Sequence, residues 1–110
     1  MRLYEKTCVP CEDSSTPGLS VEEAEKYNQQ IQNWYLQEVK SHLQISKEFR
    51  FRSFKDSINF VNKVADLAED QKHHPNILIT YSKVKITLFT HVINGLHEND
   101  FVMASKIDRL

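Results

Sequence analysis

The fold is decided within residues 49–70, FRFRSFKDSINFVNKVADLAED, where the spacing of the apolar residues changes. Up to Arg52, apolar and polar residues alternate, which is typical of a strand with one buried face. After Ser53, a favourable N-cap residue, the spacing becomes three or four, which predicts a helix with one buried face. The residues of that face are Ile58, Val61, Val64, Ala65 and Ala68, with Phe60 and Leu67 widening it.

The residues that follow predict the end of this helix and two further strands. Pro75 cannot continue a helix, so we expect the helix to end near His73. Two apolar runs, at 77–81 and 84–90, then predict a pair of strands. His91 falls at the end of the second strand.

The N-terminal half predicts a helix and a first pair of strands. Residues 1–19 contain two prolines and a glycine and are expected to be irregular. Ser20 begins a capping-box pattern, which predicts a helix over about 21–32. Residues 34–39 and 43–52 are expected to form strands, joined as a hairpin through the polar residues between them.

The order of these elements predicts the fold class. Asn94-Gly95 marks a turn, and a last helix is expected over about 98–108. The chain therefore reads α-β-β-α-β-β-α. This order implies an α+β fold with a four-stranded, mainly antiparallel sheet and three helices packed on one face. We expect residues 1–19 to be an irregular N-terminal arm and residues 20–110 to be a single domain.

Composition excludes several classes of protein. The chain has 110 residues, 26% of them charged, and a formal net charge of -1. This charge argues against a nucleic-acid partner, which usually requires a basic surface. We expect no membrane partner either, because no apolar run is long enough to cross a bilayer and no signal-peptide core follows Met1. A cytoplasmic location is the default expectation. A chain this short also leaves room for oligomerisation to bury further surface.

The cysteines Cys8 and Cys11 form a C-x-x-C pair in the arm. A structural zinc site needs two further ligands at a suitable spacing, and no second such pair exists. A thioredoxin-like site would require a buried strand before the pair, and residues 1–6 are too short and polar for one. We therefore interpret both cysteines as reduced thiols.

Three of the five histidines are candidates for a functional site. His73 and His74 lie at the C-terminal end of the central helix, where the helix dipole favours the imidazolium form of a proton donor. Glu69 precedes His73 by four residues and is expected on the same helix face. Histidine is also common before a helix end, so spacing alone leaves function and structure equally open. We interpret His42 as a solvated turn residue and His97, a poor helix cap, as a surface residue.

The histidines belong to a longer pattern, Glu69-x3-His73-His74-Pro75-x5-Tyr81-x9-His91-x8-Asp100. This pattern resembles the signature of the pterin-4a-carbinolamine dehydratase family. The aromatic run of residues 49–60, the segment 81–96 with Thr90, and the cysteine-containing arm resemble the same family. The resemblance covers nearly the whole chain.

The resemblance implies an enzyme, a hydro-lyase that removes water from 4a-hydroxytetrahydrobiopterin to give the quinonoid dihydropterin. It implies His73 and His91 as the acid and base, and His74 with Pro75 as the groups that bind the pterin. Supporting roles would fall to Glu69, Tyr81, Thr90 and Asp100. No cofactor and no metal are implied. The implied partners are the pterin substrate, a homo-oligomer (dimer or tetramer) and a functional link to an aromatic amino acid hydroxylase.

The sequence departs from the family pattern at three positions, Lys72, Ile77 and Val92, which bear on the wall of the pocket and on the surroundings of His91. Two alternatives remain. One is a non-catalytic module with the dehydratase fold, acting as an assembly factor or as a dimerisation partner of a transcription factor. The other is a metal site of His73, His74 and His91, although adjacent histidines cannot easily face one ion.

Overall fold

The computed structural model describes residues 2–9 and 17–110. The predicted element order is confirmed, with two single-turn 3-10 helices (η1, η2) added. The elements in chain order are η1 (Leu3–Glu5), α1 (Val21–Asn28), β1 (Tyr35–Val39), β2 (His42–Arg50), α2 (Phe54–Gln71), β3 (Asn76–Thr80), β4 (Lys83–Leu88), η2 (His91–Ile93) and α3 (Glu98–Ile107).

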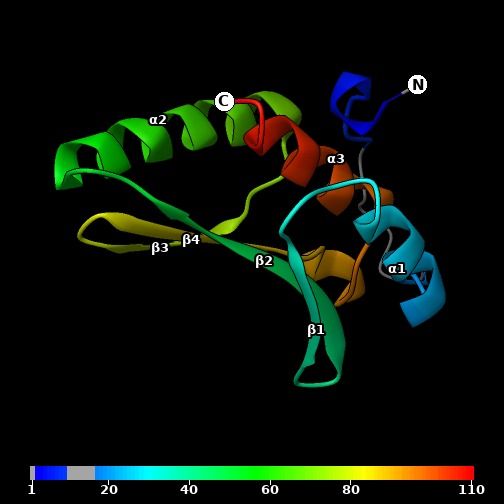
Figure 1. Ribbon diagram of the computed structural model, residues 1–110. Helices are drawn as coiled ribbons and strands as arrows, with labels where there is room; N and C mark the ends of the chain where they lie inside the picture. The colour runs from blue at the N-terminus through cyan, green and yellow to red at the C-terminus, as the bar shows by residue number, and fades with distance from the viewer. Residues whose placement is uncertain (1, 10–16) are drawn as a thin grey trace.

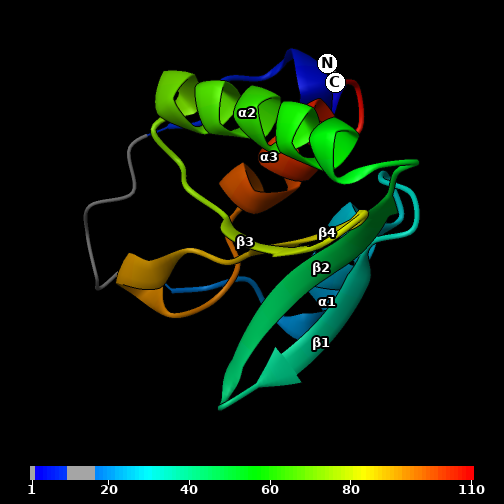
Figure 2. The same ribbon diagram turned by 90° about the vertical axis from the view of Figure 1, so that its left-hand side faces the viewer.

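The sheet has the order β1-β2-β4-β3, and every neighbouring pair is antiparallel. It curls strongly, and α2 and α3 lie across one face while α1 packs beside the β1–β2 hairpin (Figures 1 and 2). The predicted fold class is therefore confirmed. No helix among the described residues is long and apolar enough to cross a membrane.

Both hairpins turn on residues in the left-handed conformation. In the first, Lys40 and Ser41 have φ of 50° and 69° and connect the paired residues Val39 and His42. This is the geometry of a type I′ turn, which matches the twist of the strands. The second hairpin turns at Tyr81, whose φ is 53°. Neither turn contains a glycine, so the sequence carries only a weak signal for the two hairpins.

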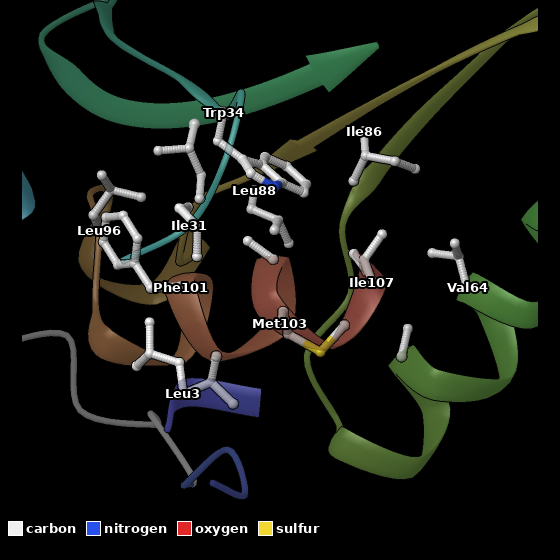
Figure 3. Close-up of a cluster of buried hydrophobic side chains, with 14 of the residues drawn as sticks. Leu3, Ile31, Trp34, Val64, Ile86, Leu88, Leu96, Phe101, Met103 and Ile107 are labelled. Carbon is white, nitrogen blue, oxygen red and sulfur yellow. The ribbon is translucent and has the colours of Figure 1, made fainter. Parts of the chain in front are cut away.

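The core lies between the sheet and α3, whose residues Phe101–Ala104 are almost completely buried. Figure 3 shows Leu88 and Ile86 of β4 and Val64 of α2 around this helix. Leu3 reaches the same core and is only 5% exposed. Residues 3–5 of the N-terminal arm form the single-turn η1, in which Leu3 is buried against α3.

The first helix is shorter than predicted. The capping box of Ser20 and Glu23 is present, but α1 ends at Asn28 and not near residue 32. Asn33 has a φ of 64°, and Ile31 and Trp34 are both buried. The chain leaves the helix early because these two side chains must enter the core, a tertiary effect that helix propensity does not contain.

Candidate active site

The C-terminal end of α2 brings two histidines to the surface between the sheet and α3. Lys72 ends the helix in the left-handed conformation, with φ of 55°, and its backbone N–H donates to the carbonyl of Ala68. The N–H of His73 reaches the same carbonyl at 3.2 Å. This turn, and not Pro75 alone, stops the helix. It also gives His73 and His74 different partners.

His73 is paired with a buried carboxylate. Its Nε2 lies 2.6 Å from Oδ1 of Asp100, a residue with 0% exposure at the first turn of α3. The other oxygen of Asp100 accepts from the hydroxyl of Thr90 at 2.9 Å and from the N–H of His97 at 3.0 Å. A buried carboxylate that accepts hydrogen bonds is best satisfied when every partner donates. We therefore assign the proton of His73 to Nε2, which leaves Nδ1 as the free ring nitrogen.

His74 has the opposite environment. Its Nε2 lies 3.0 Å from Oε1 of Glu69, and the two side chains are 61% and 80% exposed. The sequence placed Glu69 and His73 on one helix face, but the left-handed turn at Lys72 moves His73 away. The expectation that Glu69 and His73 share one helix face was therefore wrong, and the contact of Glu69 is with His74.

His91 lies in η2, just beyond the end of β4, and it packs against an aromatic side chain. Its ring centroid is 4.2 Å from that of Phe89, which in turn lies 4.5 Å from the ring of His42. Backbone hydrogen bonds between Thr90 and Gly95, of 2.7 and 3.3 Å, close the loop that contains His91. His42 is half-buried in this stack and is not the solvated turn residue that the sequence indicated.

A cavity of about 300 Å³ joins these side chains. It is lined by His73, His74, Pro75, Thr90 and His91, which the sequence had selected, and by Val9, Lys72, Asn76, Phe89, Val92 and Asn99. Folding thus brings residues 73–75 and 90–91 to one place. Asp100 lies behind the cavity and contacts it through His73 and Thr90.

Besides Asp100, two further predicted supporting residues do not line the cavity. Tyr81 is 70% exposed at the tip of the β3–β4 hairpin, and Glu69 reaches the site only through His74. Of the three departures from the family pattern, Lys72 and Val92 line the cavity. Ile77 does not line it, and it packs on the hydrophobic core from β3.

Sequence reasoning missed several contributors to the site. His97 was interpreted as a surface residue, but its Nδ1 accepts from the N–H of Asn99 and it shares a capping box with Asp100. The motif His-x-x-Asp before an apolar run contained this signal, with histidine in place of the usual serine. Phe89 follows directly after the buried Leu88 at the end of β4, and could have been recognised from that position.

Among residues 2–9 and 17–110, no three or more histidine, cysteine or acidic side chains form a group that could hold a metal ion. Cys8 lies close to the site, and its Sγ is 3.7 Å from the carbonyl of Asn99. Burial and then the negative charge of Asp100 raise the pKa of the Cys8 thiol to about 11. The interpretation of Cys8 as a reduced thiol fits this environment, whereas Cys11 lies outside the described residues.

Comparison with known proteins identifies the family of this chain. The family described as pterin 4 alpha carbinolamine dehydratase matches residues 17–110. A protein of Rubrobacter xylanophilus, provisionally named pterin-4-alpha-carbinolamine dehydratase, is 46% identical over 108 residues, which cover 98% of this chain and 97% of that protein. The chain belongs to this family.

Two solved structures share the fold. A transcriptional coactivator/pterin dehydratase from Brucella melitensis has a TM-score of 0.75 and 32% identity, over 84% of this chain and 96% of that one. A pterin dehydratase-like protein, identified as a RuBisCO assembly factor in the alpha-carboxysome, has a TM-score of 0.60 and 27% identity, over 70% and 87%. The names of these two similar structures therefore include roles other than dehydration.

Proposed function

We propose that this protein is a 4a-hydroxytetrahydrobiopterin dehydratase, which converts the 4a-carbinolamine to quinonoid dihydropterin and water. The observation that carries the proposal is the buried bond between His73 and Asp100 beside a cavity that also contains His74 and His91. A histidine held by a carboxylate, with its second ring nitrogen free, is a common arrangement for acid–base catalysis.

The reaction needs one acid and one base. The C4a–O bond breaks as the hydroxyl receives a proton and departs as water, and the N5–H bond gives its proton to a base while the nitrogen lone pair forms the C=N bond. Hydroxide is a poor leaving group, so the acid lowers the barrier most directly. One positioned acid or base typically contributes about a hundredfold to ten-thousandfold.

His73 and His91 are proposed for these two roles. Which of them protonates the hydroxyl depends on the face of the pterin that carries it. Asp100 is a positioning residue in this proposal, because it fixes the tautomer of His73 and stands beside the positive charge that the ring carries when protonated. Phe89 packs against His91 and limits the rotation of its ring.

His74 and Pro75 are proposed to bind the pterin at the open side of the cavity. The exposed pair with Glu69 leaves His74 free to exchange that partner for a substrate group. The reaction as written requires no cofactor. In the cell the carbinolamine would come from an aromatic amino acid hydroxylase, and we expect the protein to work as a homo-oligomer in the cytoplasm.

Stopped-flow dehydration of a 4a-hydroxytetrahydropterin tests the proposal. We expect His73→Ala and His91→Ala to lower kcat by about a hundredfold or more, and His74→Ala chiefly to raise KM. A wild-type rate no faster than that of buffer would overturn the assignment as an enzyme.

A non-catalytic role is the second candidate, favoured by the two solved relatives named as a coactivator and as an assembly factor. Such a protein would have no use for the acid and base, and its function should survive without them. This candidate would be supported if the wild-type protein did not turn over the pterin but did bind a protein partner.

A further inference from the structure

We propose that residues 2–9 of the N-terminal arm form one wall of the pterin pocket, with Val9 as the residue that determines how tightly the pterin fits. This inference rests on the proposed function, since it assigns the arm to the same substrate. The arm is separated from the three histidines by more than sixty residues of sequence, and the structure brings Val9 to the lining of their cavity.

The amide of Asn99 holds Val9 in place. The N–H of Val9 donates to Oδ1 of Asn99 at 3.0 Å, and Nδ2 of Asn99 donates to the carbonyl of Val9 at 2.7 Å. The side chain thus binds the backbone as a neighbouring strand would. Asn99 is only 3% exposed and precedes Asp100, so the arm is anchored beside the residue that positions His73.

A second anchor lies at the other side of the site. The N–H of Cys8 donates to Oε1 of Gln71 at 2.9 Å, and Gln71 is the last residue of α2 before the turn that leads to His73. The arm therefore contacts both segments that supply the His73–Asp100 pair. Its backbone at residues 8 and 9 is fixed relative to that pair by three hydrogen bonds.

Residues 3–6 are also attached to the core and to α3. Leu3 is buried in the core, and Lys106 donates to the carbonyl of Tyr4 at 2.9 Å. Lys6 forms an ion pair of 3.0 Å with Glu98, and this hydrogen bond helps to hold the pKa of Glu98 below its usual value. These contacts make residues 2–9 part of the folded domain, although the family model begins only at residue 17.

The side chain of Val9 is left exposed despite this fixed backbone. It is 56% exposed and lines the cavity, as does Val92 with 44% exposure. When a flat apolar surface covers apolar groups at the wall of a cavity, both surfaces leave water and the complex is stabilised. A pterin ring bound beside the histidines offers such a surface, so Val9 would stabilise the bound ring without taking part in proton transfer.

Val9→Ala tests this role by kinetics. We expect KM for the 4a-hydroxypterin to rise about three- to tenfold, because two methyl groups no longer cover the ring, with kcat changed less than twofold. Val21→Ala is the matched control: Val21 is 50% exposed on α1 and does not line the cavity, and this variant should match the wild type. A KM of Val9→Ala within twofold of the wild type would overturn the inference.

Methyl NMR supplies a readout that does not depend on turnover. On titration with 7,8-dihydrobiopterin, the Val9 methyl signals should shift together with the ring signals of His91, while the Val21 methyls stay unchanged. Shifts at His91 without shifts at Val9 would contradict the inference. If the wild type failed to dehydrate the pterin but the Val9 methyls still shifted, the proposed activity would be wrong and the arm would remain a wall of a pterin-binding site.

Discussion

Two adjacent histidines, each paired with a carboxylate, occupy opposite environments in this protein. His73 and Asp100 are 11% and 0% exposed and lie 2.6 Å apart, whereas His74 and Glu69 are 61% and 80% exposed and lie 3.0 Å apart. The sequence gives no sign of this difference, because the two rings follow each other on one side of Pro75.

This contrast in burial indicates which pair can hold a histidine in one fixed geometry for proton transfer. Solvent screens an exposed pair and the side chains remain mobile, so such a pair contributes little, about 0–1 kcal/mol. A buried carboxylate with three donors holds its histidine in one orientation and one tautomer. This contrast supports the proposed roles of His73 in proton transfer and of His74 in adaptable binding.

The largest expected effect comes from breaking the buried pair. Asp100→Asn should lower kcat by about a hundredfold to ten-thousandfold, because an amide presents hydrogens where the carboxylate accepts them and so disfavours the active tautomer of His73. Stopped-flow turnover measures the loss, and thermal unfolding shows whether the variant remains folded. A folded Asp100→Asn protein with wild-type kcat would show that His73 does not depend on its partner.

The reactivity of the Cys8 thiol depends in part on the negative charge of Asp100. Because burial and the Asp100 carboxylate raise the thiol pKa to about 11, iodoacetamide at pH 8 should react with Cys8 about a hundredfold more slowly in the folded than in the unfolded protein. The experiment uses a Cys11→Ser background, so that only one thiol reacts. Asp100→Asn should accelerate the reaction, and an unchanged rate would argue that Asp100 bears no charge.

The raised pKa of the Cys8 thiol also makes the stability of the folded protein depend on pH. The folded protein keeps the Cys8 proton at pH values where the unfolded chain, with a thiol pKa near 9, has already lost it. Stability from this group is therefore fully present below about pH 9 and falls as the pH rises towards 11.

Much of the fold could be predicted because local patterns agreed with tertiary packing. The capping box at Ser20, the change of apolar spacing at Ser53 and the alternation in β4 all correspond to real elements. The differences arose where distant residues decide the local structure. Leu3 is buried by α3, and Ile31 and Trp34 end the first helix early, and neither effect is visible in a short window of sequence.

The site was predicted only in part for a similar reason. The pattern of residues 69–100 identified the histidines, and the structure brings them to one cavity. Which carboxylate serves which histidine depends on the left-handed turn at Lys72, and lysine carries no strong signal for that conformation. The arm residue Val9 could not be found, because its contact with Asn99 spans ninety residues of sequence.

A moderate effect on kcat is expected from changing the neighbour of His91. Among the described residues this neighbour is the aromatic ring of Phe89, whereas His73 and His74 each contact a carboxylate. Phe89→Leu should lower kcat about tenfold, because the ring of His91 loses the flat surface that limits its rotation. Phe54→Leu is the matched control, since Phe54 is 53% exposed at the start of α2 and lies outside the cavity. Equal kcat in both variants would remove the positioning role of Phe89.

The smallest effect belongs to the exposed pair. Glu69→Gln should change KM by at most about twofold and leave kcat unchanged, because the ion pair is screened by solvent. Steady-state kinetics at low and high salt measure this, and the small difference should vanish at high salt. A tenfold loss of kcat would mean that the two carboxylates are equivalent and would remove the contrast between them.

A double-mutant cycle tests most directly whether Asp100 acts through His73. Values of kcat/KM are measured by stopped flow for the wild type, His73→Ala, Asp100→Asn and the double variant. If Asp100 only positions His73, the double variant should be no slower than His73→Ala alone. If the two losses in kcat/KM multiply in the double variant, Asp100 supports catalysis independently of His73, which would contradict its role as a positioning residue.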